Sequence, residues 1–293
     1  MGYLLMTNVW NEKDKIEDTI KMVLTFTLKP KLWIWIDDGS TDGTGKIIEQ
    51  LIRKYFFDLP MRVVHMPEKK IGSLATIGKA YNYTFKKLNL RLMNFDFMSI
   101  MDVDNIIHPE YYSRISAHMK VYRKFGVLSG YHFKNQRIPM GGSKCVRWEI
   151  VQSMGDFWDP APDSFLNIKA KALGYVVDVY RHPTYGFVGG PTSTRNRTYK
   201  GAYYAGALWA YVGGTKIGAI QRTIYRLLRR RFGTSFWKGF RENTVWRCDD
   251  DDVIRTYRSR LKNTYDWCKR SWISFVGYAH EKIDRRIFTS HRL

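Results

Sequence analysis

The fold is decided by Trp33-Ile34-Trp35-Ile36-Asp37-Asp38-Gly39-Ser40-Thr41-Asp42-Gly43-Thr44. Its first four residues are apolar and rich in β-forming side chains, which predicts a strand buried on both faces. Two carboxylates and a glycine turn follow, and then comes a helical pattern of apolar residues at positions 47, 48, 51, 52 and 55. Because ligands of open α/β sheets lie outside the carboxyl ends of the strands, this turn is expected to border a binding crevice.

The residue types of this turn favour binding of a base or a ribose over binding of a phosphate. Gly39 and Gly43 allow tight backbone turns, and the polar residues between them can cap the next helix. Two adjacent acids repel a phosphate, which excludes a phosphate-binding loop of the glycine-lysine type. Carboxylates such as Asp37 and Asp38 can accept hydrogen bonds from a base N–H or from ribose hydroxyls. The alternative is that both acids are merely solvated at an ordinary turn.

A second acidic strand end is predicted after residues 95–101. That apolar run ends in Asp102-Val103-Asp104-Asn105. Side chains alternate along an extended chain, so Asp102 and Asp104 are expected on the same side. Two hard oxygen donors that face one crevice can hold Mg²⁺ or Mn²⁺, while a diphosphate and water supply the other ligands. The alternative is a strand-end turn in which an aspartate caps the following segment.

Composition restricts the class of protein. A length of 293 residues, of which 44% are hydrophobic and 15% aromatic, predicts a globular protein with one large or two smaller domains. Three widely spaced cysteines fit neither a disulfide framework nor a zinc site, so a reducing compartment is expected. No secretory signal is visible. Residues 201–220 form the best candidate for a membrane span, but they contain glycines and a lysine and are expected to be core or interface.

The positive charge is concentrated toward the carboxyl terminus. The formal net charge is +21, and residues 190–293 contain 22 Lys and Arg against 8 Asp and Glu. Two thirds of the excess charge therefore lies in the last third of the chain. Such asymmetry is typical of a protein that binds a polyanionic surface, either a membrane or nucleic acid. A soluble basic protein without such a partner is the alternative.

Residues 217–232 have the pattern of a basic amphipathic helix. Its apolar stripe and the arginines that lie off it are Ile217, Ile220, Ile224, Leu227 and Leu228, and Arg222, Arg226, Arg229 and Arg230. This pattern suits a helix at the surface of an anionic membrane, where each basic side chain contributes about 1 kcal/mol. The alternative is a helix that packs its stripe in a core and exposes its arginines.

The run at residues 37–44 matches in full the signature Asp-Asp-Gly-Ser-Thr-Asp-Gly-Thr of family 2 glycosyltransferases, and the chain resembles that family over about residues 2–190. The resemblance implies a GT-A fold of the α/β class, with a mixed, mainly parallel sheet between helices. One domain over residues 1–190 would hold a nucleotide-binding half (about 1–105) and an acceptor half (about 106–190). The resemblance does not extend to residues 191–293; their charge and helical pattern predict a basic, mainly helical region that associates with a membrane.

The resemblance also implies a set of donor-binding residues. These are Asn8, Trp10, Asn11, Glu12, Asp37, Asp38, Lys79 and Asp102. Trp10 occupies the position where an aromatic ring commonly stacks on uracil, although an ordinary packed aromatic is the alternative. Lys79 lies in Gly78-Lys79-Ala80-Tyr81-Asn82, which looks like a shortened copy of the segment that borders the nucleotide pocket. Lys69 and Lys70 are further candidates to neutralise a diphosphate, unless these lysines are simply solvated.

The implied metal ligands are Asp104, Asp102 and His182. By the resemblance Asp104 binds the cation directly, and Asp102 lies nearer the ribose and the metal. His182 follows a predicted strand at residues 176–181, and Phe187 would also fit the spacing of this further metal or phosphate ligand. A divalent cation, Mn²⁺ or Mg²⁺, would offset the charge of the departing nucleoside diphosphate.

The implied catalytic base is Asp163. Family members place two acids at the start of a helix and a Gly-Tyr pair about a dozen residues later, here Gly174-Tyr175. Asp163 matches the second acid, whereas Pro162 replaces the first. A carboxylate at a helix N-terminus stays ionised and can accept a proton from a hydroxyl. Asp156 and Asp159 are the reserve candidates, and a helix cap is the alternative role of Asp163.

Together these features predict an inverting glycosyltransferase that uses a UDP- or GDP-sugar. We expect a cytoplasmic enzyme on the inner, anionic face of a membrane, with a polyprenyl-linked or other lipid-linked acceptor or a cell-surface glycan, and no nucleic acid partner. The alternatives are a catalytically silent GT-A-like binding protein and a nucleic-acid-binding protein, although the latter leaves the acidic strand ends unexplained. A sugar nucleotidyltransferase would need a glycine-arginine-rich first loop, which residues 8–11 do not provide.

Overall fold

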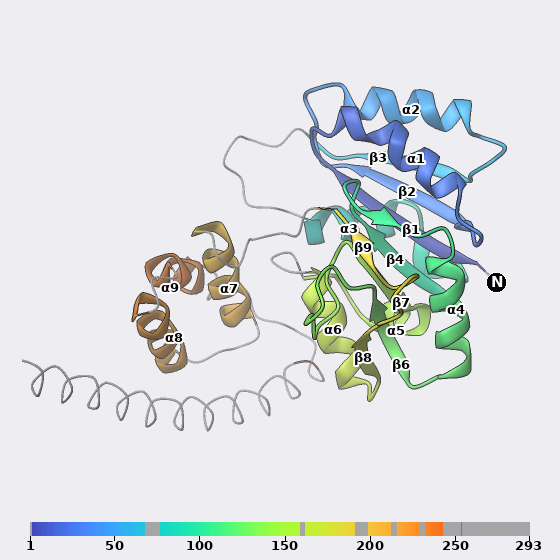
Figure 1. Ribbon diagram of the computed structural model, residues 1–293. Coiled ribbons are helices and arrows are strands. Elements are labelled where there is room, and N and C mark those ends of the chain that lie inside the picture. Colours follow the sequence, from blue (N-terminus) through green and yellow to red (C-terminus); the bar gives the residue numbers. More distant parts are fainter. Residues whose placement is uncertain are drawn as a thin grey trace, which may run out of the picture.

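A computed structural model gives the structure of the protein and describes residues 2–67, 77–158, 162–190, 199–211, 216–228, 232–242 and 253. Within these ranges a seven-stranded sheet with helices on both faces forms an α/β body, and helices α7, α8 and α9 form a separate group (Figure 1).

The central sheet has the strand order β3-β2-β1-β4-β7-β6-β8. Strands β1 to β4 are parallel, β7 runs antiparallel to both β4 and β6, and β8 is parallel to β6. A separate ribbon pairs β5 with β9. The strands are β1 (Tyr3–Val9), β2 (Leu32–Asp37), β3 (Met61–His65), β4 (Phe97–Met101), β5 (Ile106–Ile107), β6 (Phe125–Ser129), β7 (Ser143–Arg147), β8 (Val176–Val179) and β9 (Val188–Gly189). The predicted mixed, mainly parallel α/β sheet is confirmed.

Strand β2 is buried along its whole length, as its apolar sequence predicts. Alternation directs Trp33 and Trp35 into the core on one face of the sheet and Ile34 and Ile36 into the core on the other. The two tryptophan rings lie 4.4 Å apart, and the indole N–H of Trp33 donates to Thr7 of β1 at 3.0 Å. β2 therefore anchors both faces and holds its acidic end in a fixed place.

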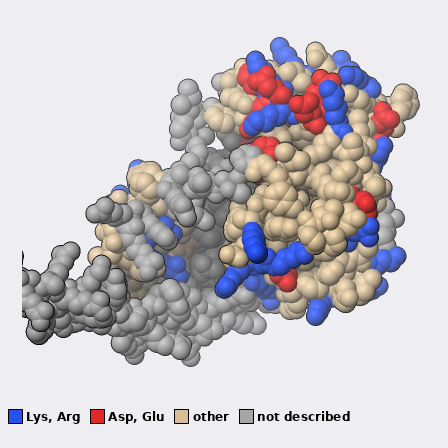
Figure 2. All heavy atoms as spheres, in the orientation of Figure 1, with Lys and Arg blue, Asp and Glu red and all other residues tan. Residues whose placement is uncertain are grey.

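Two layers of helices cover the sheet. One face packs against α1 (Ile16–Leu24), α2 (Thr44–Lys54) and α4 (Tyr111–Val121), and the other against α3 (Ile77–Lys87), α5 (Trp148–Ser153) and α6 (Pro162–Ala172). Short 3₁₀ turns precede α1 (η1, Lys13–Lys15) and follow α3 (η2, Leu90–Leu92). Figure 2 shows acidic and basic side chains interspersed over α1 and α2, where Lys54 pairs with Glu17 at 3.1 Å.

The sequence pattern of residues 144–151 predicts a single strand, and the second half of this prediction is wrong. Strand β7 ends at Arg147, and α5 begins at Trp148. The neighbouring strand β4 begins at Phe97, which pairs with Arg147. Residues 148–151 consequently have no strand to pair with, and they continue as a helix that buries Trp148, Ile150 and Val151.

The carboxyl-terminal group contains α7 (Tyr199–Tyr211), α8 (Lys216–Leu228) and α9 (Gly233–Glu242). The predicted helix at residues 217–232 corresponds to α8. Helices α7 and α9 cross closely. Gly206 and Gly239 permit this approach, because a Cβ at either position would overlap the backbone of the other helix. Among the described helices, none is both long and apolar enough to span a membrane. The domain boundary at residue 190 stays a prediction.

Candidate active site

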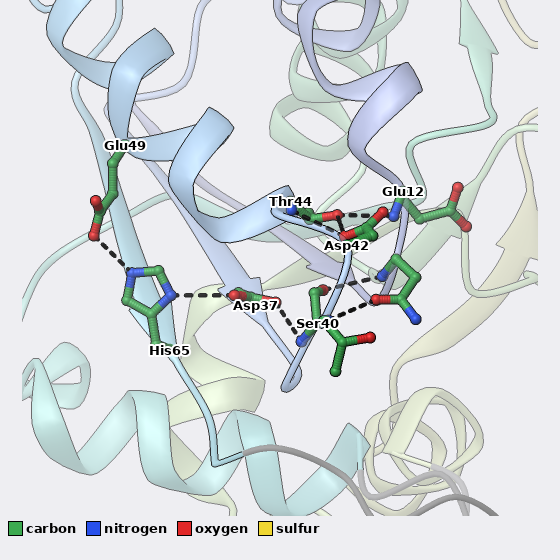
Figure 3. A network of polar contacts seen from close by, with 9 residues as sticks. Glu12, Asp37, Ser40, Asp42, Thr44, Glu49 and His65 are labelled. Carbon is green, nitrogen blue, oxygen red and sulfur yellow. Dashed lines mark hydrogen bonds and ion pairs between the residues drawn. The ribbon is translucent and has the colours of Figure 1, made fainter.

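The turn after β2 is held by the carboxylate of Asp37, which is 6% exposed. Its Oδ1 accepts a hydrogen bond from the backbone N–H of Ser40 at 3.0 Å, and its Oδ2 lies 3.2 Å from Nδ1 of His65 on β3. The other ring nitrogen of His65 lies 3.0 Å from Glu49 of α2 (Figure 3). Asp37 thus ties the turn to the neighbouring strand and, through His65, to the following helix.

The loop after β1 is joined to the same turn by three hydrogen bonds. The backbone N–H of Asn11 donates to Oγ of Ser40 at 3.0 Å, and the side-chain oxygen of Asn11 accepts from the N–H of Thr41 at 2.8 Å. The N–H of Glu12 donates to Oγ1 of Thr44 at 3.0 Å (Figure 3). The predicted donor-binding residues Asn11 and Glu12 are therefore brought together with residues 37–44.

Asp42 caps helix α2 from inside the turn. Its Oδ1 accepts from the backbone N–H of Thr44 at 2.9 Å, and its Oδ2 accepts from the N–H of Lys13 at 3.3 Å. Burial opposes ionisation of Asp42, but the hydrogen bonds from Thr44 and Lys13 outweigh it and lower the pKa of the carboxyl. Gly43 has φ of 92°, a backbone conformation that favours glycine.

The other predicted donor-binding residues of these two loops have contrasting environments. Trp10 is 50% exposed, so it is not a packed core aromatic and can meet a ligand. Asp38 is 1% exposed, and its backbone N–H donates to the carbonyl of Val9 at 2.9 Å. In the part of the chain that the structure describes, Oδ1 of Asn8 is buried without a hydrogen-bond partner. Such an atom is a candidate for a ligand contact.

Three acids from different elements gather near one buried phenol. Tyr81 of α3 is 2% exposed, and burial raises the pKa of its hydroxyl. The charges of Asp102, Asp163 and Asp38, in that order, raise this pKa further. We name Asp38, Asp102 and Asp163 the acid cluster. The ends of β2 and β4 and the start of α6 therefore converge at the carboxyl edge of the sheet, the edge that binds ligands in open α/β sheets.

The glycine pair before β7 makes room for two of these acids. An ideal Cβ at Gly142 would lie 2.7 Å from Oδ2 of Asp102, and one at Gly141 would lie 3.6 Å from Oδ2 of Asp163. The carbonyl of Gly142 accepts from the backbone N–H of Asp102 at 3.2 Å and from the side-chain amide of Asn105. Asp102 and Asp163 consequently lie against consecutive residues of one turn.

Asp104 is half-buried and faces a histidine that the sequence reasoning missed. Burial lowers the pKa of His132, while the charge of Asp104 and a hydrogen bond to the backbone of Val188 act in the opposite direction. Within the described residues, Nδ1 of His132 is buried without a hydrogen-bond partner. The one sequence feature that could have indicated His132 as a site residue is its position three residues after β6, which is a weak signal.

The predicted ligand His182 has a different environment. Its Nδ1 accepts the backbone N–H groups of Thr184 and Tyr185 at 3.3 and 3.2 Å, and its ring stacks on that of Tyr185 at a centroid distance of 4.5 Å. Over the described ranges, no group of three or more His, Cys, Asp or Glu side chains is placed to hold a metal ion. The metal-binding roles of Asp102, Asp104 and His182 stay predictions.

Asp163 stands in the first turn of α6, whose first residue is Pro162. Proline is favoured at the first helical position because its missing N–H would have no partner there. Asp163 contacts Lys144 of β7, which is fully buried. Nζ of Lys144 donates to the carbonyl of Asp163 at 2.5 Å and lies 4.0 Å from Oδ2 of Asp163. Burial lowers the pKa of Lys144 to about 8, although the charge of Asp163 raises it. The sequence feature that could have indicated this buried side chain is the position of a lysine next to the apolar residues Cys145 and Val146.

The remaining candidates are less closely placed. Lys79 is exposed on the first turn of α3. Asp156 is also exposed, and its charge acts on Arg91. Lys69, Lys70 and Asp159 lie outside the described residues.

Comparison with known proteins identifies the chain. The family model for glycosyl transferase family 2 matches residues 6–159, which is more than half of the chain and includes both acidic strand ends. The chain belongs to glycosyl transferase family 2. The predicted membership is confirmed, and this family 2 protein is a glycosyltransferase.

Solved structures similar to this family 2 glycosyltransferase share its GT-A fold at low identity. The mannosyltransferase PcManGT from Pyrobaculum calidifontis, in complex with GDP-Man and Mn²⁺, has a TM-score of 0.53 and 14% identity over 98% of this chain and 83% of its own. Glucosyl-3-phosphoglycerate synthase from Mycobacterium tuberculosis, in complex with Mn²⁺, UDP and glucosyl-3-phosphoglycerate, has a TM-score of 0.53 and 15% identity over 73% and 81%. TarS from S. aureus has a TM-score of 0.51 and 17% identity over 79% of this chain and 43% of its own, so the chain spans less than half of TarS.

Proposed function

We propose that this glycosyltransferase moves a sugar from a nucleoside diphosphate sugar to an acceptor hydroxyl by a single in-line displacement with inversion. The observation that carries the proposal is the acid cluster, in which Asp38, Asp102 and Asp163 gather near Tyr81. Asp38 and Asp102 follow β2 and β4, two parallel strands on either side of β1, and Asp163 lies in the first turn of α6. Carboxylates on both sides of one site can bind a donor and activate an acceptor.

The donor would lie across the ends of β1, β2 and β4. Trp10 offers an exposed ring for stacking on the base, and Asn8 offers a buried oxygen that accepts a hydrogen bond. The carboxylates of Asp38 and Asp102 can accept hydrogen bonds from a base or a ribose. Two of the similar structures were solved with GDP-Man or with UDP, which supports a UDP- or GDP-sugar as the donor class.

A divalent cation fits the residues at the end of β4. Asp102 is exposed and Asp104 is half-buried, so both carboxylates can meet a ligand, and His132 brings a buried nitrogen without a partner among the described residues near Asp104. Oxygen donors of this kind suit Mg²⁺ or Mn²⁺ when a diphosphate and water complete the coordination. When bound, the cation would neutralise charge on the departing diphosphate.

Asp163 would be the general base. Its side chain is 44% exposed in the first turn of α6, so the hydroxyl of an acceptor can reach the carboxylate. It would accept the proton of the acceptor hydroxyl as that oxygen attacks the anomeric carbon. The acid cluster places Asp163 with Asp102, whereas Asp156 is exposed beside Arg91, which favours Asp163 over that reserve candidate.

A membrane-bound acceptor is supported by α8. The apolar stripe of this helix is exposed: Ile217 is 69% exposed, Ile220 43% and Ile224 42%. The guanidinium groups of Arg222 and Arg226 lie over the rings of Trp209 and Phe236, at 4.0 and 5.1 Å. These contacts turn the apolar stripe away from α7 and α9, which favours an interfacial helix over a core-packed one. We infer docking on an anionic membrane that carries a lipid-linked acceptor.

A donor screen tests the proposed reaction. The protein is mixed with UDP-glucose, UDP-N-acetylglucosamine or GDP-mannose, with Mn²⁺ or with EDTA, and both the melting temperature and the released UDP or GDP are measured. We expect one donor to raise the melting temperature and to be hydrolysed slowly when Mn²⁺ is present. Failure of every UDP- and GDP-sugar to bind or to be hydrolysed would contradict the proposal.

Variants separate binding from catalysis. D38A should remove the thermal shift caused by the donor, because it deletes a binding carboxylate. D163N should keep that shift but lower turnover about 100-fold or more, the range expected for a lost general base. D18N is the matched control, because the Asp18 side chain is 86% exposed on α1. Equal turnover of D163N and D18N would exclude Asp163 as the base.

A further inference from the structure

Lys144 is a charged side chain at an unusual place in the core. It is fully buried in β7, where it pairs with Ile100, a residue of β4 shortly before Asp102. Its ammonium group donates to the carbonyl oxygen of Asp163 and lies 4.0 Å from the carboxylate of the same residue. The Lys144 side chain therefore contacts both the backbone carbonyl and the carboxylate of Asp163, the proposed base.

Stability does not explain this lysine. An ammonium group taken out of water is unfavourable, and the attraction to a carboxylate at 4.0 Å that is itself 44% exposed offsets this only in part. An apolar side chain of similar length would fill the same space without the loss of hydration. The neighbours Cys145 and Val146 of β7 are buried apolar side chains. A buried charge that is retained against stability points to a role in the site.

We propose that Lys144 is a positioning residue that fixes the start of α6 and draws the carboxylate of Asp163 over Gly141, toward the acceptor hydroxyl. This inference rests on the proposed role of Asp163 as the base. Lys144 itself is fully buried and does not touch the substrate, so it acts through Asp163 alone.

The charge of Lys144 gives the inference a pH signature. The charged group that acts on it is Asp163 on α6, which in turn lies near Tyr81 of α3 together with the other two acids of the acid cluster, Asp38 and Asp102. Burial lowers the pKa of Lys144 to about 8, so the ammonium form is lost as the pH rises through that value. Turnover of the wild type should therefore fall on the alkaline side near pH 8.

The kinetic test compares Lys144→Met and Lys144→Arg with Lys169→Met, which removes another buried lysine from α6. The readouts are hydrolysis of UDP-glucose, UDP-N-acetylglucosamine and GDP-mannose from pH 6 to 10 and the thermal shift that each donor causes. Lys144→Met should keep the thermal shift, lose tenfold or more in kcat and lose the alkaline decline. Lys144→Arg should recover part of kcat and move the decline above pH 9, while Lys169→Met should follow the wild type.

A structural test needs no turnover. Crystal structures of the wild type and Lys144→Met should show the Asp163 carboxylate beside Gly141 in the former and displaced by more than 1 Å in the latter. An unchanged carboxylate, an unchanged alkaline decline, or equal losses of kcat in Lys144→Met and Lys144→Arg would overturn the inference. If no donor is hydrolysed but the carboxylate moves as expected, the proposed function fails and the positioning by Lys144 stands.

Discussion

The carboxylate of Asp102 lies directly against the backbone of Gly142, the residue that precedes β7. The backbone N–H of Asp102 donates to the carbonyl of Gly142 at 3.2 Å, and the side-chain amide of Asn105 donates to the same oxygen. The end of β4 and the turn before β7 therefore form one unit, in which a side chain at position 142 has no room.

Replacement of Gly142 by alanine tests this unit. The new Cβ would overlap the side-chain amide of Asn105 and would lie 2.7 Å from Oδ2 of Asp102, so both side chains would have to move. We expect donor affinity to fall about tenfold and the free energy of unfolding to fall by about 1–3 kcal/mol, the usual effect of overpacking. Thermal shift with the donor and urea unfolding measure the two effects.

Gly141→Ala is the matched control for that variant, because its Cβ would lie 3.6 Å from Asp163, an ordinary contact distance. The two alanine variants should differ clearly in donor affinity. Similar affinities would mean that the contact between Asp102 and Gly142 does not matter for binding.

The link between Asp37 and His65 predicts a loss of stability in His65→Ala. This change leaves Oδ2 of the nearly buried Asp37 without its contact at 3.2 Å, which costs about 1–3 kcal/mol. Because Asp37 also holds the N–H of Ser40, the turn should loosen and donor binding should weaken. Glu49→Gln is the control, since the partly exposed pair of Glu49 with His65 contributes at most about 1 kcal/mol. A His65→Ala protein as stable as Glu49→Gln would contradict the prediction.

Lys144 predicts an unusual dependence of stability on pH. Its pKa is lowered to about 8 in the folded chain from 10.5, so between these values the unfolded chain binds a proton that the folded chain lacks. Below pH 8, Lys144 lowers the free energy of unfolding most. As the pH rises from 8 to 10.5, the free energy of unfolding increases by on the order of 3 kcal/mol. Lys144→Met should exceed the wild type in stability at pH 7, and the difference should shrink at pH 10. Urea unfolding at both pH values measures it, and a constant difference would refute the assignment.

The exposed stripe of α8 predicts binding to anionic membranes. Ile220→Ser combined with Ile224→Ser should reduce sedimentation with vesicles of phosphatidylglycerol and phosphatidylcholine, because these side chains are exposed and would enter the lipid surface. The melting temperature should change little. Leu92→Ser is the control, since Leu92 is 87% exposed on the α/β body. Equal binding of the wild type to neutral and anionic vesicles at low salt would count against membrane docking.

The sequence alone determined strands β2 and β4, their acidic ends and the family. Alternation and apolar runs are local properties, so β2 and β4 and the acids that follow them could be predicted from adjacent residues. The match at residues 37–44 then implied the GT-A fold, which the sheet order and the family match confirm. Donor contacts, the metal ligands and the base stay predictions.

Tertiary structure alone decided which side chains meet. Insertion of antiparallel β7 between β4 and β6 brings Lys144 beneath Asp163, and the packing of α3 places Tyr81 beside three acids. Burial lowers the pKa of His132 while the charge of Asp104 opposes that shift, a relationship between two residues that are distant in the sequence. Periodicity located the stripe of α8 but not the direction that it faces, because that depends on Arg222 and Arg226 meeting rings of α7 and α9. These relationships join residues far apart in the chain, and no local pattern encodes the order in which strands and helices pack.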